Sequence, residues 1–379
     1  MRSGGPGWAW LVLASVACGA GNATGAVDRP QATTSGAIAI ANLDHEIARR
    51  QDGAEVEELL LARARFLGDY ESLDRATALA EGRFRNGGEL LQRARSRSAE
   101  HRFAEALADV VAAKRAGASP EETGALRASI LVATGRAAEV VAQLEAGAGR
   151  RPGFASRSAL AAAYAAVGRF DDADRAYVAA LGDLDTTSPF PYAWVYFARG
   201  SMWAEQAGDP TRAEAMYTQA LILLPEFAAA NVHLAELEVA RGDLASAVAR
   251  LERVVAASGE PEALALLGAL HARTGDPVRG RLEIARARRR FEALLARHPL
   301  AFADHAAEFY LGPGADAERA WSLACQNLAG RQTDRAFALA IEAARASGRS
   351  REASVLAARM GRATGRQGPA SRAVSPGPR

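Results

Sequence analysis

The sequence predicts an all-α chain that is built from about nine repeated pairs of helices. Three observations lead to this prediction: apolar residues recur three and four positions apart, glycines recur at regular distances, and a small residue recurs every 33 or 34 residues along most of the chain. Spacings of three and four residues place side chains on one face of a helix, and regularly placed glycines mark helix ends. Together these patterns indicate short helices that are joined by tight turns.

The clearest pair of helices lies between Ser156 and Leu181. Tyr164 lies on the apolar side of the first helix, and Ala173 and Tyr177 lie on that of the second. Ala173 is small at a point where two helices must approach closely, whereas Tyr177 is large enough to fill the space against the next unit. Gly168 stands between the helices and can adopt a positive φ at little cost, which suits a helix end.

The same register continues through most of the chain. The residues equivalent to Ala173 are separated by 33, 34 or 40 positions and are Leu73, Ala106, Val140, Ala173, Ala213, Ala247, Gly280, Ala320 and Ala353. Five positions before each of them stand Gly68, His101, Gly135, Gly168, Gly208, Gly242, Gly275, Ala315 and Gly348. Seven of these nine residues are glycine, so we expect this series to mark the turn inside each unit.

These residues make the chain resemble the tetratricopeptide repeat family, whose unit is a helix–turn–helix of about 34 residues. The resemblance covers residues 54–362 and is strongest at 154–260, where Tyr177, Tyr217 and Pro225 also match. It implies an all-α, right-handed superhelical solenoid of about nine units, in which each unit packs on its neighbours. It also implies a protein that acts by binding a protein or peptide, without identifying that partner.

The composition limits the classes of partner. The 379 residues carry a formal net charge of +2, which is too balanced to indicate a nucleic-acid-binding protein. Lys114 is the only lysine, and the abundance of arginine, alanine and glycine is typical of a GC-rich bacterial genome. The two cysteines, Cys18 and Cys325, are too few for a disulfide framework.

The N-terminal residues are typical of an exported protein. Arg2 precedes a short apolar run that ends in small residues, so we expect residues 1–17 to be a signal peptide. Cys18 resembles the lipidation site of bacterial lipoproteins, although Ser15 stands where such sites usually carry leucine. Membrane attachment through Cys18, ordinary cleavage and no export remain as alternatives. The first two place the protein outside the cytoplasm, in the periplasm or cell envelope.

Three further segments flank the predicted repeats. Residues 18–35 are rich in glycine, alanine and threonine, and we expect them to form a flexible tether. Residues 36–53 show helical spacing and are expected to form a helix that caps the first unit. Residues 363–379 are rich in glycine, proline, serine and arginine, and we expect them to be disordered.

Two spacings of 40 residues indicate insertions. After Leu181, the sequence DTTSPFPYAWVYF predicts a proline-containing loop. No helix-breaking residue occurs between Val278 and His298, so these extra residues are expected to lengthen one helix by about two turns. One side of that helix carries Ile284, Phe291, Leu294 and Leu295, and the other carries Arg286, Arg289, Arg290 and Arg297. The arginines form either a solvated face or a site for an anion or a lipid headgroup.

The family resemblance also implies where a partner binds. In that family the first helix of each unit lines the concave face. The matching inward positions with the least alanine-like residues are Arg199, Met202, His233, Glu236, Phe302, His305 and Phe309. The members that bind chaperones hold a terminal carboxylate with lysine and asparagine at such positions, and this chain has neither there. The remaining mixed groove suits an extended or helical peptide.

The sequence contains no strong catalytic motif. It has no glycine-rich phosphate loop after a strand and no paired cysteine motif, so neither a cofactor nor a metal is predicted. His305 and Glu308 share a helix face and could ligate a metal near His298, but a third ligand is not evident. We therefore predict a non-enzymatic scaffold of the cell envelope. The alternatives are a metal- or anion-dependent enzyme that uses His298–Phe309 and a purely structural envelope component.

Overall fold

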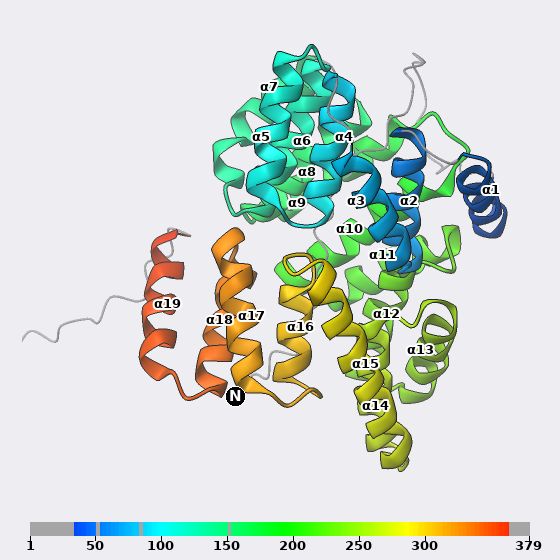
Figure 1. The fold of residues 1–379 in the computed structure, drawn as a ribbon, viewed down its shortest axis with the longest axis vertical. Helices are drawn as coiled ribbons and strands as arrows, with labels where there is room; N and C mark the ends of the chain where they lie inside the picture. Colours follow the sequence, from blue (N-terminus) through cyan, green and yellow to red (C-terminus); the bar gives the residue numbers. More distant parts are fainter. Residues whose placement is uncertain (1–33, 51–53, 83–85, 151–152, 364–379) are drawn as a thin grey trace, which may run out of the picture.

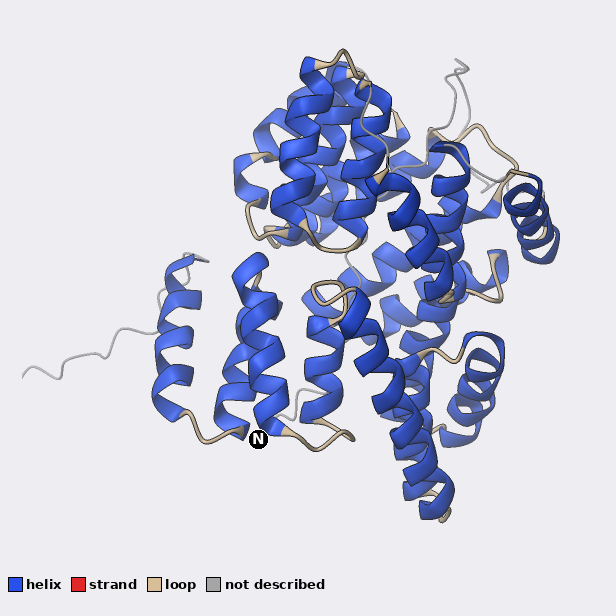
Figure 2. Ribbon diagram, viewed as in Figure 1, coloured by secondary structure: helices blue, strands red, loops and turns tan. Residues whose placement is uncertain are grey.

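The computed structural model describes residues 34–50, 54–82, 86–150 and 153–363. Within these residues all regular structure is helical, with nineteen α-helices, one 3₁₀ turn, one π-helical turn and no strand (Figure 2). The predicted all-α helical repeat solenoid is confirmed (Figure 1). The predicted signal peptide, Cys18 and nearly all of the two flanking tails lie outside the described residues. None of the described helices is both long enough and apolar enough to cross a membrane.

After α1 (Gly36–Arg49), the helices form nine consecutive pairs, which we number as repeats 1–9. The first helices are α2 (Ala54–Leu67), α4 (Gly87–Ala99), α6 (Pro120–Ala133), α8 (Phe154–Ala166), α10 (Pro189–Ser201), α12 (Ala228–Ala240), α14 (Pro261–Arg273), α16 (Ala303–Leu311) and α18 (Asp334–Ala346). The second helices are α3 (Tyr70–Glu81), α5 (Phe103–Arg115), α7 (Val141–Arg150), α9 (Phe170–Gly182), α11 (Pro210–Leu223), α13 (Leu244–Ser258), α15 (Pro277–Arg297), α17 (Ala317–Gly330) and α19 (Ser350–Ala363). The 3₁₀ turn η1 (Ala137–Glu139) precedes α7, and the π turn η2 (Met202–Gln206) continues α10.

The turn inside each repeat lies where the sequence predicts it. All nine residues of the glycine series have a positive φ, between 49° and 104°. The two members that are not glycine, His101 and Ala315, are the only non-glycine residues with a positive φ in the described part of the chain. A left-handed residue after a helix lets the chain reverse its direction. The repeat geometry therefore imposes this conformation even where a side chain makes it costly.

Small and large side chains alternate where the helices pack. Ala173 and Ala213 are fully buried, and Tyr177 and Tyr217 are 4% and 0% exposed. A Cβ atom on Gly200 would lie 2.5 Å from the ring of Tyr217, so this ring rests directly on the backbone of α10. The tyrosines thus fill the space that the small residues leave open, as the register predicts.

The two insertions have different structures. Pro189 and Pro191 lie in the first turn of α10, where proline is tolerated because the first N–H groups of a helix lack an intrahelical acceptor. The prediction of a proline-containing loop is therefore wrong, and the extra residues are shared between 183–188 and the π turn η2. The predicted lengthening of the other helix is confirmed, since α15 has 21 residues and its partner α14 has 13.

The α1 helix contacts the first repeat and also reaches the fifth. Leu43 and Ile47 join Val56 and Leu60 in one buried cluster, so α1 covers apolar surface of α2. The N-terminal end of α1 lies near the end of α11, because a Cβ atom on Gly36 would be 2.9 Å from a side-chain carbon of Pro225. The helix therefore packs against parts of the chain that are distant in sequence.

The array curls so tightly that its first three repeats touch its last four. Each contact joins a turn of an early repeat to a connection between two late repeats: Gly68 to Glu260, His101 to Leu300, and Thr134 to Gln332. Repeat 1 thus meets the connection between repeats 6 and 7, and repeats 2 and 3 meet the next two connections in order. One turn of the superhelix therefore takes about six repeats, and successive turns lie on each other.

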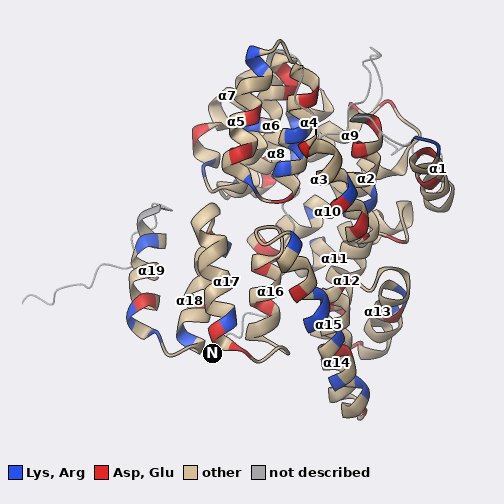
Figure 3. Ribbon diagram, viewed as in Figure 1, with Lys and Arg blue, Asp and Glu red and all other residues tan. Residues whose placement is uncertain are grey.

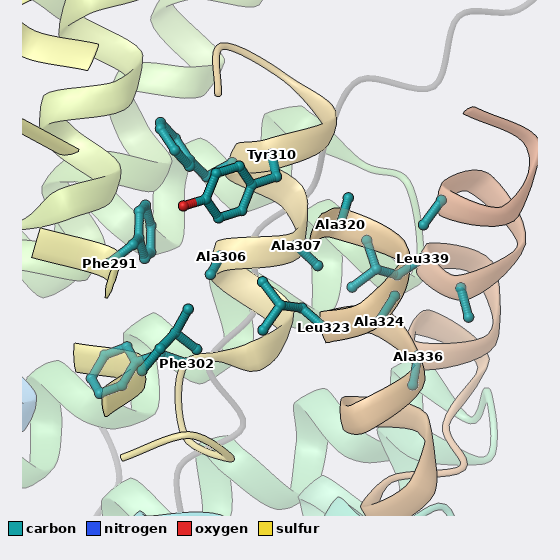
Figure 4. Packing of buried hydrophobic residues seen from close by; sticks show 14 of the residues in the cluster. Phe291, Phe302, Ala306, Ala307, Tyr310, Ala320, Leu323, Ala324, Ala336 and Leu339 are labelled. Atoms are coloured by element: carbon teal, nitrogen blue, oxygen red, sulfur yellow. The ribbon is translucent and has the colours of Figure 1, made fainter. Parts of the chain in front are cut away.

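Aromatic rings fill part of the contact between these turns. The rings of Phe66 and Phe227 have centroids 4.9 Å apart, and those of Tyr70 and Phe302 are also 4.9 Å apart in an edge-to-face arrangement. Figure 4 shows Phe302 and Phe291 packed among the helices of the last repeats. Because such pairs join repeats that are far apart in sequence, the apolar core continues between the two turns.

A charged contact also holds the turns together. His298 is 4% exposed, and its ring nitrogens donate to Oε1 of Glu100 at 2.9 Å and to Oδ1 of Asp74 at 2.6 Å. Arg297 also pairs with Asp74. Burial opposes the charge on His298, but the hydrogen bonds to Glu100 and Asp74 raise its pKa above the ordinary value. We call Asp74, Glu100, Arg297 and His298 the inter-turn bridge.

Candidate functional site

The inner side of the superhelix holds a cluster of charged side chains. They come from η2, from the first helices of repeats 6–9 and from the connection before α18. The inner cluster consists of Glu205, His233, Glu236, Glu262, Asp304, His305, Glu308, Arg331 and Arg335. Its five carboxyl groups outnumber its two guanidinium groups. The net charge of the cluster also depends on the protonation of its two imidazole rings.

Arg335 connects opposite sides of the inner cluster. Its guanidinium donates to Oε2 of Glu205 at 3.0 Å and to Oε1 of Glu308 at 2.7 Å. Glu205 belongs to repeat 5 and Arg335 to repeat 9, so a single side chain spans the inner face between them. The inner face is therefore closed around a small volume and does not form a wide groove.

His305 lies in the deepest part of the inner cluster. Its side chain is 1% exposed, and its Nδ1 pairs with Glu262. Asp304 beside it accepts a hydrogen bond from Arg331 at 2.7 Å. Arg331 also donates to the backbone carbonyl of Ala133 in repeat 3 at 3.4 Å, so this part of the cluster is fixed to the neighbouring turn of the superhelix.

Burial raises the pKa of three carboxyl groups of the cluster. It raises the pKa of Glu205 to about 7 and that of Glu308 to about 8, although Arg335 acts in the opposite direction. Burial and the nearby Glu262 carboxylate raise the pKa of Glu236 well above its ordinary value. The environment therefore disfavours further negative charge at these three positions.

The two histidines are shifted in opposite directions. Burial lowers the pKa of His233. Burial also opposes the charge on His305, but the carboxylates of Glu262 and Asp304 outweigh it and raise the pKa of His305 to about 9. Burial alone would raise the pKa of Asp304, yet His305 and Arg331 hold it below its usual range. At neutral pH His305 is thus the charged histidine of the cluster.

One end of the inner cluster reaches solvent. The side chains of Glu205, Glu236, Glu308 and Arg335 are 10%, 18%, 10% and 23% exposed, and we call these four residues the mouth of the cluster. Glu236 Oε1, Glu308 Oε2 and the neighbouring His233 Nε2 are buried and make no hydrogen bond with any described residue. An unpaired buried polar atom costs about 1–3 kcal/mol, so these atoms would gain from a partner that supplies hydrogen-bond donors.

Most of the residues predicted to line a groove are buried. Met202, Phe302 and Phe309 are 1%, 1% and 0% exposed, and His233 and His305 are 3% and 0% exposed. Phe302 packs on Tyr70, and Phe309 packs on Phe291 with ring centroids 5.1 Å apart. The prediction that these aromatic rings are available to a partner is therefore wrong. The reason is that the closed superhelix covers the face that an open array would expose.

The two remaining groove predictions have different surroundings. Arg199 donates to both carboxylate oxygens of Asp174, at 2.8 Å and 3.0 Å, and Trp203 donates to the same carboxylate at 3.2 Å. This arginine therefore joins repeats 4 and 5. Glu236 is the predicted groove residue that lies at the mouth of the inner cluster. Its Oε2 is 3.3 Å from Nδ1 of His233.

The residues considered for a metal site are not brought together. His298 belongs to the inter-turn bridge, whereas His305 and Glu308 belong to the inner cluster. In the described ranges, no group of three histidine, cysteine, aspartate or glutamate residues is arranged to hold a metal ion. The histidines and the glutamate considered as metal ligands are therefore engaged in two separate contacts.

The four arginines predicted as an anion-binding side fall into two classes. Arg290 donates to the backbone carbonyl of Ser258 at 3.2 Å, and Arg297 pairs with Asp74. Arg286 and Arg289 are exposed, and neither makes a hydrogen bond or ion pair with a described residue. The helix thus keeps only part of the predicted basic side free.

Sequence reasoning missed Glu262 and Arg335 as members of the inner cluster. They lie in the first turns of α14 and α18, where a charged residue normally faces solvent. They are inside because the first helices converge on the axis of the superhelix. A signal was present, since neither residue has an opposite charge three or four positions away in its own helix.

Comparison with known proteins agrees with this repeat architecture. Residues 204–270, from η2 to α14, match the tetratricopeptide repeat family. Residues 204–270 therefore carry the tetratricopeptide repeat pattern, and the remaining pairs of helices have a similar helix–turn–helix architecture. Such repeats generally mediate contacts between proteins, and they are generally non-enzymatic, so the fold supports a protein–protein interaction scaffold in general.

Two solved structures are similar to this chain at low sequence identity. The APC/C hetero-tetramer Cut9–Hcn1 is 16% identical with a TM-score of 0.49, over 88% of this chain and 68% of that chain. A tetratricopeptide repeat protein from Parabacteroides merdae ATCC 43184 is 15% identical with a TM-score of 0.40, over 68% of this chain and 98% of that chain. Both scores lie below 0.5, and neither structure defines how these repeats are arranged. No curated protein matches the chain with significance.

Proposed function

We propose that this protein is a non-enzymatic scaffold of the bacterial cell envelope that binds a segment of a partner protein at the mouth of the inner cluster. The segment supplies an arginine or lysine side chain, which pairs with Glu236 and Glu308. The observation that carries this proposal is the pair of buried, unpaired carboxyl oxygens, Glu236 Oε1 and Glu308 Oε2.

The mouth favours a cationic group at pH values at which its glutamates are ionised. Glu205, Glu236 and Glu308 surround one guanidinium group, that of Arg335, so the mouth carries an excess of negative charge when all three are ionised. A bound cation would lower the raised pKa values of these glutamates and let them ionise. Binding should therefore release protons, and the affinity should increase as the pH rises from 6 to 9.

The place of the protein in the envelope rests on its N-terminal sequence. Residues 1–17 have the charge and apolar run of a signal peptide, and Cys18 follows at the position of a lipoprotein anchor. The proposal places the mature protein outside the cytoplasm, where Cys18 is the candidate attachment to a membrane.

The test begins with crosslinking of the full-length chain in an envelope extract. The crosslinked segment of the partner is identified by mass spectrometry, synthesised as a fluorescent peptide, and titrated against the protein at pH 6 and pH 8.5. We expect an arginine or lysine whose replacement by glutamine weakens binding. Glu236→Gln combined with Glu308→Gln should weaken binding at least tenfold, because hydrogen bonds to charged groups contribute about 1.5–3 kcal/mol each.

The matched control is Glu121→Gln combined with Glu226→Gln, which removes two exposed carboxylates elsewhere and should leave binding unchanged. Three results would contradict the proposal: a bound segment without a basic residue, equal loss in the control variant, or an affinity that does not change with pH. A chain that captures no partner segment at all would favour the purely structural envelope component.

A further inference from the structure

The hairpin of α14 and α15 extends beyond the neighbouring helices. Figure 1 shows the connection between α14 and α15 at the lower end of the molecule. The two helices pack with their backbones in contact, because a Cβ atom on Gly280 would lie 2.6 Å from the carbonyl oxygen of Gly268. A Cβ atom on Gly268 would likewise lie 2.8 Å from Ile284. This close packing holds the outer side of α15 in a fixed position.

The outer side of α15 is apolar in its middle and basic at its edges. Val278 and Leu282 are 59% and 63% exposed and lie one helical turn apart. At 100° per residue, Arg289 continues the line of Val278 and Leu282 along the helix, and Arg281 and Arg286 lie on either side of that line. We call these five residues the α15 face.

The two acidic residues of α15 nearest this face, Glu283 and Glu292, are both paired with other side chains. Glu283 is buried and accepts a hydrogen bond from His271 at 2.6 Å. Glu292 lies three residues after Arg289 on the same side of the helix, and its carboxylate pairs with Arg319 of repeat 8 at 2.8 Å. The acidic residues of α15 are therefore engaged elsewhere, and the arginines of the α15 face keep their positive charge.

The arginines of the α15 face differ from others in the same helix. Arg279 pairs with Glu252 at 2.7 Å, so its charge is already balanced. Arg281, Arg286 and Arg289 are exposed and make no hydrogen bond or ion pair with any residue in the described part of the chain. Figure 3 shows the basic residues along α15 in blue. Their charges are available to an anionic surface.

We propose that the α15 face binds the surface of an anionic lipid bilayer. The three arginines pair with headgroup phosphates, while Val278 and Leu282 enter the boundary between headgroups and acyl chains. A helix bound in this way lies along the membrane and does not span it. This contact is independent of the inner cluster, which faces the opposite side of the repeats.

The shape of the hairpin favours a bilayer over a protein partner. The α15 face is formed by five residues of one helix, whereas a stable protein interface buries about 800 Å² on each partner. A fluid bilayer adapts to a single helix and offers a phosphate at every headgroup, so several arginines can be paired at once. Exposed aliphatic side chains between arginines are typical of helices that bind in the plane of a membrane.

The test is flotation of the full-length chain with vesicles. The chain carries Cys18→Ser, so that no acyl group on that residue contributes. Vesicles of phosphatidylcholine with phosphatidylglycerol should bind the chain, vesicles of phosphatidylcholine alone should not, and high salt should weaken binding. R281Q/R286Q/R289Q should bind about a hundredfold less, because each arginine near an anionic surface contributes roughly fivefold. V278S/L282S should also weaken binding, by about tenfold.

The control is R115Q/R127Q/R351Q, which removes three exposed arginines from other repeats and changes the net charge equally. It should bind like the parent chain, and circular dichroism should show that every variant is folded. The proposal fails if the parent chain does not float with anionic vesicles or if the control loses as much binding. If millimolar inorganic phosphate releases the chain from the vesicles, the α15 face binds a free anion instead of a bilayer. If the chain binds poly-glutamate as tightly as it binds the anionic vesicles, the face binds an acidic protein.

Discussion

Replacing His298 by glutamine should loosen the contact between the first and last turns of the superhelix. The buried imidazolium of His298 donates to Glu100 in repeat 2 and to Asp74 in repeat 1. Glutamine carries no charge and cannot donate to both carboxylates in this geometry. The variant therefore removes two charged hydrogen bonds that connect residues about 200 positions apart in the chain.

The size of the effect follows from what remains after the substitution. A buried charge that loses its only partner costs about 3–5 kcal/mol. Here each carboxylate keeps one guanidinium, because Arg102 lies 3.2 Å from Glu100 and Arg297 pairs with Asp74. We therefore expect a loss of about 2 kcal/mol in the free energy of unfolding, near the value of one hydrogen bond to a charged group.

The effect must depend on pH with a defined sign. The pKa of His298 is raised in the folded chain above its unfolded value of 6.5. Its contribution to stability is therefore complete below pH 6.5 and is lost as the pH rises through the folded-state pKa. The difference between the parent chain and His298→Gln should accordingly be largest at pH 6 and should shrink at pH 9.5.

Urea unfolding followed by circular dichroism at these two pH values measures that difference. Comparing each variant with the parent chain at the same pH removes the contributions of the inner cluster, whose groups also titrate in this range. His45→Gln is the control, since His45 is exposed on α1 and should change nothing. Equal losses at both pH values, or no loss at pH 6, would refute the reasoning.

Four further predictions concern packing and export. Tyr177→Ala should lower the free energy of unfolding by about 3–5 kcal/mol, and a loss below about 1 kcal/mol would contradict the repeat register. Gly200→Ala should cost about 1–3 kcal/mol in urea unfolding, because its methyl group would overlap the adjacent tyrosine ring, and an unchanged midpoint would exclude that contact. Phe302→Ala should lower the free energy of unfolding by about 3–5 kcal/mol, because the ring is buried. A variant as stable as the parent chain would indicate that this ring lies in an open groove. Mass spectrometry of the native protein should find residues 1–17 absent, and a diacylglycerol mass on Cys18 would identify a lipid anchor; an intact N-terminus would oppose export.

The local fold could be predicted because each repeat carries its own signals. The glycine series located all nine turns, and the positive φ of His101 and Ala315 shows that the register held even where the residue type departed from the pattern. The long helix α15 followed from the absence of any breaker between two turns. The proline-containing loop was wrong because proline is compatible with both a loop and the first turn of a helix, and sequence alone does not distinguish them.

The candidate site was harder to predict because it depends on contacts between distant repeats. The sequence predicts that Phe302 lines a groove, because an open array would expose its position, but Tyr70 from the other turn covers it. That contact depends on the small rotation between successive repeats, which accumulates over about six units and leaves no mark in the local pattern. For the same reason, Glu262 and Arg335 could be recognised as charged but not as members of one cluster.

The contacts between turns of the superhelix fix the number of repeats between repeat 3 and repeat 7. In an open array each unit contacts its immediate neighbours, so a unit can be gained or lost with little effect on the others. Here Asp74 must meet His298 and Thr134 must meet Gln332. Inserting or deleting one unit between repeats 3 and 7 would place every early turn opposite the wrong residue. The chain is thus restricted in the way that a closed β-barrel is restricted in its number of strands, although it is built from a motif that is otherwise free to multiply.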